Sequence, residues 1–107
     1  MTEAVAADPV LHRFRTELAA LYGDRLERVV LFGSRARGEA RVDSDYDVAV
    51  FLQGLKDRWQ EVDRIVPLVT DIIDDTGAVI HAMPYPAGSW RERTSLMREI
   101  RREGVDL

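Results

Sequence analysis

The stretch VVLFGSRARGEARVDSDYDVAVFL, residues 29–52, decides the fold because it holds two short apolar runs around a turn that contains glycine. The first run, Val29–Phe32, and the second, Val48–Leu52, are long enough for buried strands and too short for helices. Gly33 interrupts the apolar pattern, and residues 35–37 then predict a single helical turn. The stretch therefore predicts a strand, a helical turn, a polar loop and a second strand.

Two aspartates stand at the start of the second apolar run. Residues i and i+2 of an extended strand point to the same face, so we expect Asp45 and Asp47 to project side by side, about 6–7 Å apart along the chain. Two carboxylates at this spacing suit Mg²⁺, which takes oxygen ligands and shares them with substrate phosphates. A pair of such ions can stabilise both the attacking and the leaving oxygen of a phosphoryl displacement.

The turn formed by Gly33 and Ser34 supplies a complementary feature. Glycine lets backbone N–H groups approach a ligand closely, and a helix that starts after it presents free N–H groups to an anion. This phosphate-binding turn and the carboxylates lie together if the two predicted strands are neighbours. Their combination predicts a nucleotide site more strongly than either motif alone.

Gly33-Ser34, ten intervening residues and then Asp45-Tyr46-Asp47, each beside an apolar run, resemble the signature of the DNA polymerase β-type nucleotidyltransferases. More narrowly, the chain resembles the minimal nucleotidyltransferases, or MNT proteins, which include antitoxins partnered with HEPN-domain toxins. The resemblance implies that Asp45 and Asp47 are the catalytic, Mg²⁺-binding carboxylates. It also implies that the nucleotide is bound by Gly33, Ser34, Arg35, Gly38 and Ser44.

The family places a third carboxylate on the next strand, and this chain departs from that pattern. The third predicted strand, Ala78–Met83, contains neither Asp nor Glu. Val79 and His81 are the two residues that could stand at the third position. Histidine is a common general base, so His81 could take that role; the alternative is a histidine hydrogen-bonded at the sheet surface.

The remaining sequence predicts helices around these strands. We expect residues 1–7 to be frayed, and Asp8-Pro9 is a favourable helix start that leads to an end at Gly23. A second amphipathic helix follows the second strand, with its apolar stripe expected in the core and a kink or break expected at Pro67. That stripe comprises Trp59, Val62, Val66, Val69 and Ile73, and Ile65 and Ile72 widen it.

A last helix is expected after a capping box formed by Ser89 and Glu92. The segment Ser89–Leu107 combines many arginines with Trp90, a composition enriched at protein interfaces. The order of elements predicts an α/β or α+β fold in one domain, residues 1–107, with helices packed on a small sheet. The resemblance implies that this sheet is mixed and palm-like.

Composition narrows the class of protein. The chain has 107 residues and no cysteine, which excludes disulfides and thiolate metal sites. Its formal net charge of −4 argues against nucleic acid as a direct partner. We find neither a membrane-length apolar run nor a secretory signal, so we expect a cytoplasmic protein without a membrane partner.

Three functions remain open. The first is transfer of AMP from ATP, with Mg²⁺ as cofactor, to a hydroxyl of a HEPN toxin, which the chain would silence as its antitoxin. A chain of this size leaves little room for an acceptor-binding domain of its own, which favours an acceptor on another protein. The second is neutralisation of the toxin by binding alone, with weakened chemistry. The third is transfer to an aminoglycoside-like small molecule, with the chain as a homo-oligomer.

Overall fold

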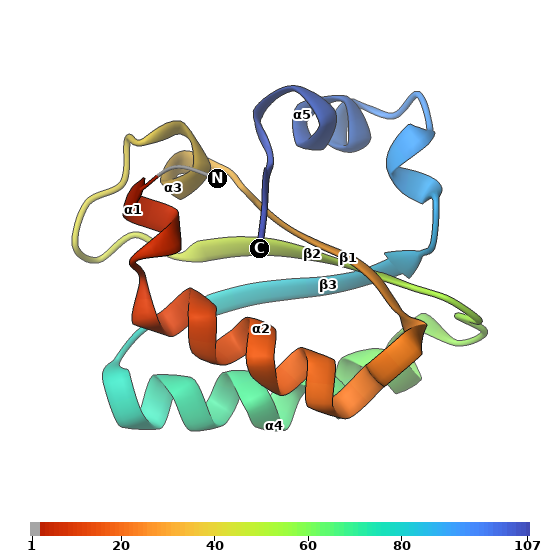
Figure 1. The fold of residues 1–107 in the computed structure, drawn as a ribbon, viewed down its shortest axis with the longest axis horizontal. Coiled ribbons are helices and arrows are strands. Elements are labelled where there is room, and N and C mark those ends of the chain that lie inside the picture. Colours follow the sequence, from red (N-terminus) through yellow and green to blue (C-terminus); the bar gives the residue numbers. More distant parts are fainter. Residues whose placement is uncertain (1–2) are drawn as a thin grey trace.

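The structure is a computed structural model that describes residues 3–107, with side chains from Val5 onward; Figure 1 shows its helices and strands. The helices are α1 (Glu3–Ala6), α2 (Pro9–Tyr22), α3 (Ser34–Arg37), α4 (Arg58–Thr76) and α5 (Ser95–Glu103). The strands are β1 (Leu26–Phe32), β2 (Tyr46–Leu52), β3 (Ile80–Pro86) and β4 (Val105–Asp106). Two short 3-10 turns cover Gly23–Arg25 and Ser89–Arg91.

Within the described residues the strands form a mixed sheet in the order β3-β2-β1-β4. β1 is antiparallel to both β2 and β4, whereas β2 and β3 are parallel. Parallel neighbours need a crossover connection, and α4 supplies it between β2 and β3. The mixed sheet packed with helices confirms the predicted fold class.

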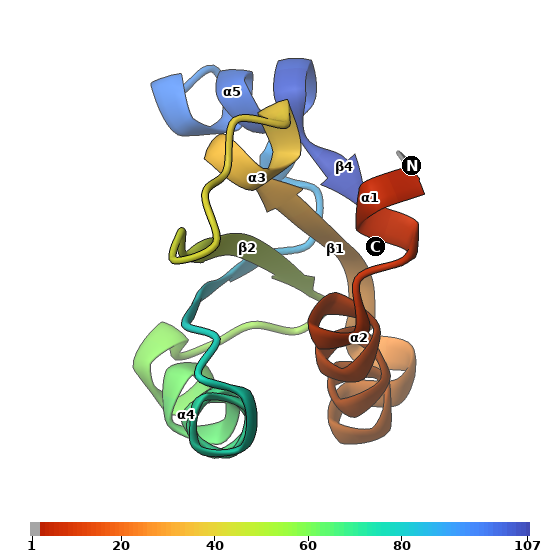
Figure 2. The same cartoon turned by 90° about the vertical axis from the view of Figure 1, so that its left-hand side faces the viewer.

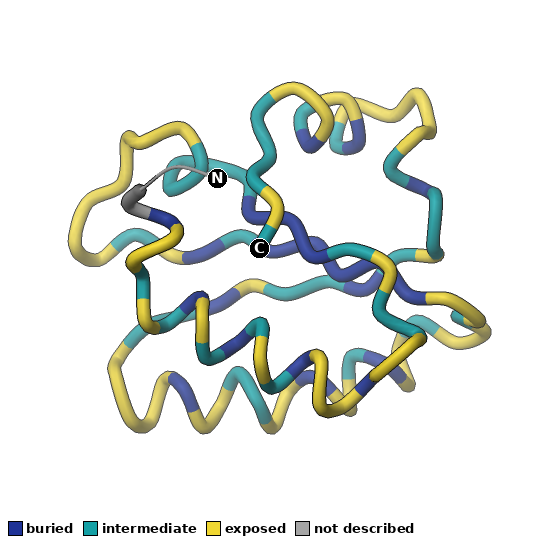
Figure 3. Tube along the Cα trace, viewed as in Figure 1, coloured by how far each residue is buried: buried dark blue, intermediate teal, exposed yellow. Residues whose placement is uncertain are grey.

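The larger core lies between one face of the sheet and helices α2 and α4, which run along that face (Figure 2). It includes Phe14 from α2, Leu31 from β1 and Ile72 from α4, which are fully buried. Burial is concentrated along the strands and the inward faces of the helices (Figure 3). This core fixes the positions of β1 and β2, the two strands that carry the predicted site.

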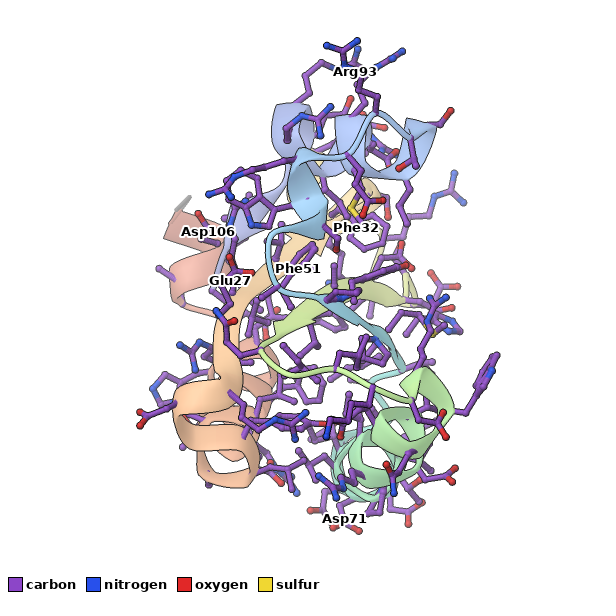
Figure 4. The ribbon with its side chains drawn as sticks, turned by 90° about the vertical axis from the view of Figure 1, so that its right-hand side faces the viewer. Glu27, Phe32, Phe51, Asp71, Arg93 and Asp106 are labelled. Carbon is purple, nitrogen blue, oxygen red and sulfur yellow. The ribbon has the colours of Figure 1, made fainter. Side chains whose placement is uncertain are left out.

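The opposite face of the sheet carries a smaller core beneath α5. Met97 and Ile100 of α5 pack there against Val30, Ala49 and Phe51. Figure 4 shows Phe51, together with Phe32, on the side of the sheet that α5 covers. The apolar face of the last helix therefore closes the protein's own core.

The start of the chain differs from the expected frayed segment over the part that the structure describes. Residues 3–6 form the helical turn α1, and Val5 is only 7% exposed because it joins the larger core. Asp8 caps α2 as predicted, since its carboxylate accepts hydrogen bonds from the N–H groups of Val10 and Leu11. Residues 1–2 lie outside the described residues.

Helix α4 agrees with its prediction only in part. It continues through Pro67 as one helix, so the expected break is absent. Ile65 and Ile72, which were expected to widen the apolar stripe, are buried together with the charged Glu61, whereas Trp59, Val66 and Ile73 of the stripe itself are exposed.

The C-terminal elements begin later than predicted. β3 extends to Pro86 and includes Pro84, which an edge strand tolerates because one side of its backbone needs no partner. Ser89 opens a 3-10 turn rather than the last helix. Thr94 is the actual N-cap of α5, with its side chain accepting a hydrogen bond from the N–H of Met97 at 3.1 Å. Among the described helices, none is both long and apolar enough to cross a membrane.

Candidate nucleotide and metal site

The end of β1 and the start of β2 meet at one point, as neighbouring antiparallel strands. Phe32, the last residue of β1, is paired with Asp47 of β2. Gly33 follows with φ 76° and ψ −159°, a backbone conformation that is essentially restricted to glycine. A Cβ atom on Gly33 would collide with the carboxylate of Asp47. The structure thus places the predicted turn directly against one of the two predicted carboxylates.

Helix α3 begins immediately after Gly33. The carbonyl of Gly33 accepts the first helical hydrogen bonds, from the N–H groups of Ala36 at 3.1 Å and Arg37 at 3.2 Å. The N–H groups of Ser34 and Arg35 precede those bonds, as the first donors of a helix do. They belong to the same short segment that packs against Asp47, which makes this segment the candidate phosphate-binding turn.

Asp45 lies one residue before β2, and its carboxylate has a specific partner on β3. The Nε2 atom of His81 is 2.8 Å from Oδ2 of Asp45. His81 is also paired in register with Asp47, so of the two residues considered for the third position it is His81 that joins the aspartates. The side chains of His81 and Asp45 are 60% and 47% exposed, which leaves this edge of the site open to solvent.

Arg35, Gly38 and Ser44 shape the loop that connects α3 to β2. The Nε of Arg35 donates a hydrogen bond to the carbonyl of Ser44 at 2.9 Å, and its guanidinium lies 3.9 Å from the centre of the Tyr46 ring. The Oγ of Ser44 accepts a hydrogen bond from the N–H of Arg41. Gly38 ends α3 in the left-handed conformation.

The loop contacts of Arg35 lie on the opposite side of β2 from the carboxylate of Asp47. Tyr46 and Asp47 are successive residues of the strand, so their side chains point to opposite faces. Arg35 and Gly38 line a pocket together with Tyr46 and Asp8. The structure therefore brings Gly33, Ser34 and the two aspartates together, and gives the other three predicted nucleotide-binding residues loop contacts instead.

Tyr46 is a supporting residue that the sequence analysis did not identify. Its hydroxyl donates a 2.6 Å hydrogen bond to Asp8, the residue that caps α2. Burial, followed by the hydrogen bond and the negative charge of Asp8, raises the pKa of Tyr46 to about 12. Asp8 and Tyr46 are 38 residues apart, so no local pattern could have paired them.

The residues present fit a Mg²⁺ ion that is held partly by its substrate. Among the side chains described, those of residues 5–107, no three carboxylate or histidine groups are placed to hold a metal ion by themselves. Mg²⁺ keeps several waters and is commonly bound through one or two carboxylates plus substrate phosphates. Asp45 and Asp47 beside the Gly33 turn provide that donor set, whereas a closed, all-protein metal cage would need more ligands.

Sequence comparison relates this chain to known proteins. The sequence model of the nucleotidyltransferase domain family matches residues 11–101. A candidate protein adenylyltransferase of Methanocaldococcus jannaschii is 26% identical over 98 residues, which cover 92% of this chain and 95% of that protein.

Solved structures share the fold at lower identity. A candidate nucleotidyltransferase from Sulfolobus solfataricus superposes with a TM-score of 0.60 and 22% identity, covering 91% of this chain and 75% of that one. A toxin–antitoxin complex with AMP-PNP gives a TM-score of 0.58 at 18% identity, covering 87% and 68% of the two chains. A mutant of the MntA-HpeT toxin–antitoxin gives 0.59 at 17%, covering 86% and 68%.

Proposed function

The chain belongs to the nucleotidyltransferase domain family, and we propose that it transfers the AMP group of ATP to a hydroxyl on a partner protein. The partner in this proposal is a HEPN-domain toxin, which the modification silences, so that the chain acts as an antitoxin. Two findings support it: a relative bears the name of a protein adenylyltransferase, and two structures with the same fold are toxin–antitoxin assemblies.

The contact between Gly33 and the carboxylate of Asp47 carries this proposal. A turn that only connects two strands does not require a glycine packed against a carboxylate. A nucleotide site requires this close approach, because the triphosphate and the metal ion that accompanies it occupy neighbouring positions. The glycine leaves room for both, and the adjoining N–H groups of α3 can donate to phosphate oxygens.

The reaction needs little covalent help from the protein. An oxygen of the acceptor hydroxyl forms a bond to the α-phosphorus, the bond to the bridging oxygen of pyrophosphate breaks, and the hydroxyl proton passes to solvent. Mg²⁺ held by Asp45 and Asp47 would supply neutralisation of the phosphate charge. The protein's own residues position the reactants: the Gly33 turn holds the phosphates, and His81 fixes the orientation of the Asp45 carboxylate through their hydrogen bond.

The exposure of the site supports an acceptor carried by another protein. Asp45 and His81 are about half exposed, so the carboxylate edge of the site lies at the surface rather than in an enclosed cleft. A small-molecule acceptor would need an enclosing pocket to hold it in line with the α-phosphate. A folded partner protein supplies both the acceptor hydroxyl and the surface that positions it.

A second function, neutralisation by binding without catalysis, is favoured by one specific observation. The third strand offers His81 beside Asp47 where the family has a carboxylate. If the imidazole cannot replace that carboxylate, the fold persists and the transfer is lost. The two functions predict different chemistry on the same partner, and one experiment separates them.

The test is mass spectrometry of a purified HEPN-domain protein after incubation with the chain, ATP and Mg²⁺. We expect a mass gain of one or more AMP units. Asp47→Asn should abolish the gain, and its melting temperature without Mg²⁺ should hold or rise because removing one of two neighbouring carboxylates relieves repulsion.

Asp43→Asn is the matched control, because Asp43 is an exposed carboxylate in the loop before the site. This variant should transfer AMP like the wild type. A stable complex without any mass gain would establish the binding function instead. Full activity in Asp47→Asn would exclude the assigned metal site.

A further inference from the structure

Arg37, the last residue of α3, lies among three carboxylates. Its Nη1 atom is 3.4 Å from Oε2 of Glu103 and 3.8 Å from Oε1 of Glu99, both on α5. Its Nε atom is 3.1 Å from Oε1 of Glu39, which lies in the loop after α3. A single surface ion pair contributes little stability, but several carboxylates around one guanidinium form a network that restricts its movement.

Helix α3 is too short to fix its own orientation. It has four residues, whereas an isolated helix becomes stable only at about 12–15 residues. It lies between Gly33 and Gly38, which have φ values of 76° and 74°, and glycine restricts the backbone less than any other residue. The side-chain contacts of α3 therefore determine where the free N–H groups of Ser34 and Arg35 point.

Three successive side chains attach α3 to three different parts of the protein. Ala36 packs its methyl group against the larger core. Arg35 donates hydrogen bonds to carbonyl groups of the loop before β2, and most of that loop is itself exposed. Arg37 contacts Glu103, which is 66 residues away in the sequence. Arg37 therefore attaches α3 to a regular helix on the α5 side of the sheet.

Helix α5 is a firm support for this contact. Its residues Met97 and Ile100 are only 4% and 1% exposed, because they pack on the sheet in the smaller core. A Cβ atom on Gly104, directly after α5, would collide with the side chain of Val30 in β1. Val30 is three residues before Gly33. The strand that leads into the turn and the helix that contacts Arg37 are therefore packed directly against each other.

An arginine so near a phosphate-binding turn could also contact phosphate directly, and the geometry argues against that role. The Nη1 atom of Arg37 already contacts two carboxylates of α5, and these compete with a phosphate for the same donor. To reach the nucleotide, the guanidinium would have to leave Glu103 and Glu99. The contacts observed instead connect α3 to its support.

We propose that Arg37 is a positioning residue, which holds the phosphate-binding turn in place by joining α3 to Glu103 and Glu99 of α5. This role rests on the proposed function, which places the phosphates at the Gly33 turn. The two glutamates then act on nucleotide binding without touching the nucleotide. Breaking their contact with Arg37 loosens the turn, even when the change adds positive charge near the phosphates.

The first test follows the turn without nucleotide, through hydrogen exchange of the Ala36 amide, which donates to the Gly33 carbonyl at 3.1 Å. We expect Arg37→Ala to speed this exchange ~3–5-fold, the size of effect that a group of surface ion pairs produces. Arg13→Ala is the matched control: the Arg13 side chain is 35% exposed, against 34% for Arg37, and pairs with carboxylates of α2 and α4 instead. It should leave the exchange of Ala36 unchanged. Unchanged exchange in Arg37→Ala would overturn the positioning role, whether or not the chain binds nucleotide.

The second test exchanges the two charges and measures binding of a non-hydrolysable ATP analogue with Mg²⁺ by calorimetry. We expect Arg37→Glu and Glu103→Arg each to weaken binding ~2–5-fold, and the double variant Arg37→Glu/Glu103→Arg to regain most of the loss. Glu103→Arg is the sharpest variant, because its added positive charge alone would tighten binding of an anion. Tighter binding by Glu103→Arg, or a double variant no better than Arg37→Glu, would overturn the positioning role. A wild type that binds no nucleotide would refute the proposed function, and the exchange of Ala36 would still decide the role of Arg37.

Discussion

Replacing Gly33 with alanine tests the site at its closest contact. The backbone at Gly33 has φ 76° and ψ −159°, and a side chain in this region costs on the order of 1–3 kcal/mol. For a domain of about this size, ~1 kcal/mol corresponds to about 4 °C in melting temperature. We therefore expect Gly33→Ala to lower the melting temperature by about 4–12 °C.

The added methyl group should affect ligand binding more than stability. It would occupy the position of the Asp47 carboxylate oxygen, which is the movable end of a side chain and can rotate away at small energetic cost. A rotated carboxylate no longer stands beside the phosphate-binding turn. We expect Gly33→Ala to lose binding of Mg²⁺ together with ATP, beyond what its lower stability explains.

Gly23→Ala separates these two effects. Gly23 also has a positive φ, 54°, with ψ −127°, but a Cβ there meets no atom of the described residues within 4 Å. The assay is thermal unfolding with and without Mg²⁺ and a non-hydrolysable ATP analogue. A ligand at one hundred times its Kd stabilises by ~2.7 kcal/mol, which is about 10 °C on the same scale.

Wild type and Gly23→Ala should show this ligand-induced rise, and Gly33→Ala should not. A Gly33→Ala variant with the full rise would refute the assignment of the turn and of Asp47 as one site. Unchanged melting temperatures of both variants without ligand would refute the backbone argument.

Two further predictions concern the residues around the site. His81→Ala removes the partner of Asp45, so the ligand-induced rise should shrink; His81→Gln, which can still donate a hydrogen bond, should retain more of it, and equal losses would contradict a positioning role. The pKa of Tyr46 is raised to about 12 from about 10 in an unfolded chain, so the folded state holds this proton more tightly. The free energy of unfolding that this raised pKa contributes is fully present below pH ~10 and is lost as the pH rises toward ~12. Urea unfolding from pH 8 to 11.5 should show this fall, with a shallower slope in Tyr46→Phe; the residual slope comes from Tyr22, whose pKa burial also raises to about 12. Identical slopes in the wild type and Tyr46→Phe would contradict the raised pKa of Tyr46.

The predicted strands and the main site motif could be read from the sequence because their signals are local. The apolar runs that became β1 and β2 are interrupted by Gly33, whose special backbone conformation only glycine adopts readily. The pairing of those strands then follows from their being consecutive, since sequential strands are usually neighbours. Local pattern and short connection together were enough to bring the Gly33 turn to Asp47.

The orientation of α4 could be read only in part, because its apolar residues cover a wide face. Ile65 and Ile72 were placed in that face, but no local signal indicated that Glu61 would be buried beside them. In the structure the carboxylate of Glu61 pairs with Arg25, and the hydroxyl of Tyr22 lies within hydrogen-bond reach of the same side chain. These partners come from the end of α2 and the turn after it, so only the tertiary fold shows that this charge can be buried. The residues at the other edge of the apolar face, Trp59, Val66 and Ile73, are exposed instead.

Arg35 shows a corresponding limit for the site. An arginine next to a phosphate-binding turn suits phosphate contact by its chemistry, but its guanidinium is already engaged by the Ser44 carbonyl and the Tyr46 ring. Residue type and proximity in sequence made Arg35 a candidate for phosphate contact. Its guanidinium packs on the ring of Tyr46, and side chains alternate between the two faces of β2, so the carboxylate of the next residue, Asp47, lies on the opposite face.

His81 is the residue at which the chain departs from the pattern of its family. Its position in β3 follows from the parallel register with Asp47, and its Nε2 lies 2.8 Å from Oδ2 of Asp45. The imidazole therefore connects the strand position beside one carboxylate to the loop residue that carries the other. A chain without a carboxylate on β3 thus has a side chain there that orients Asp45, and this is the role that His81→Ala and His81→Gln measure.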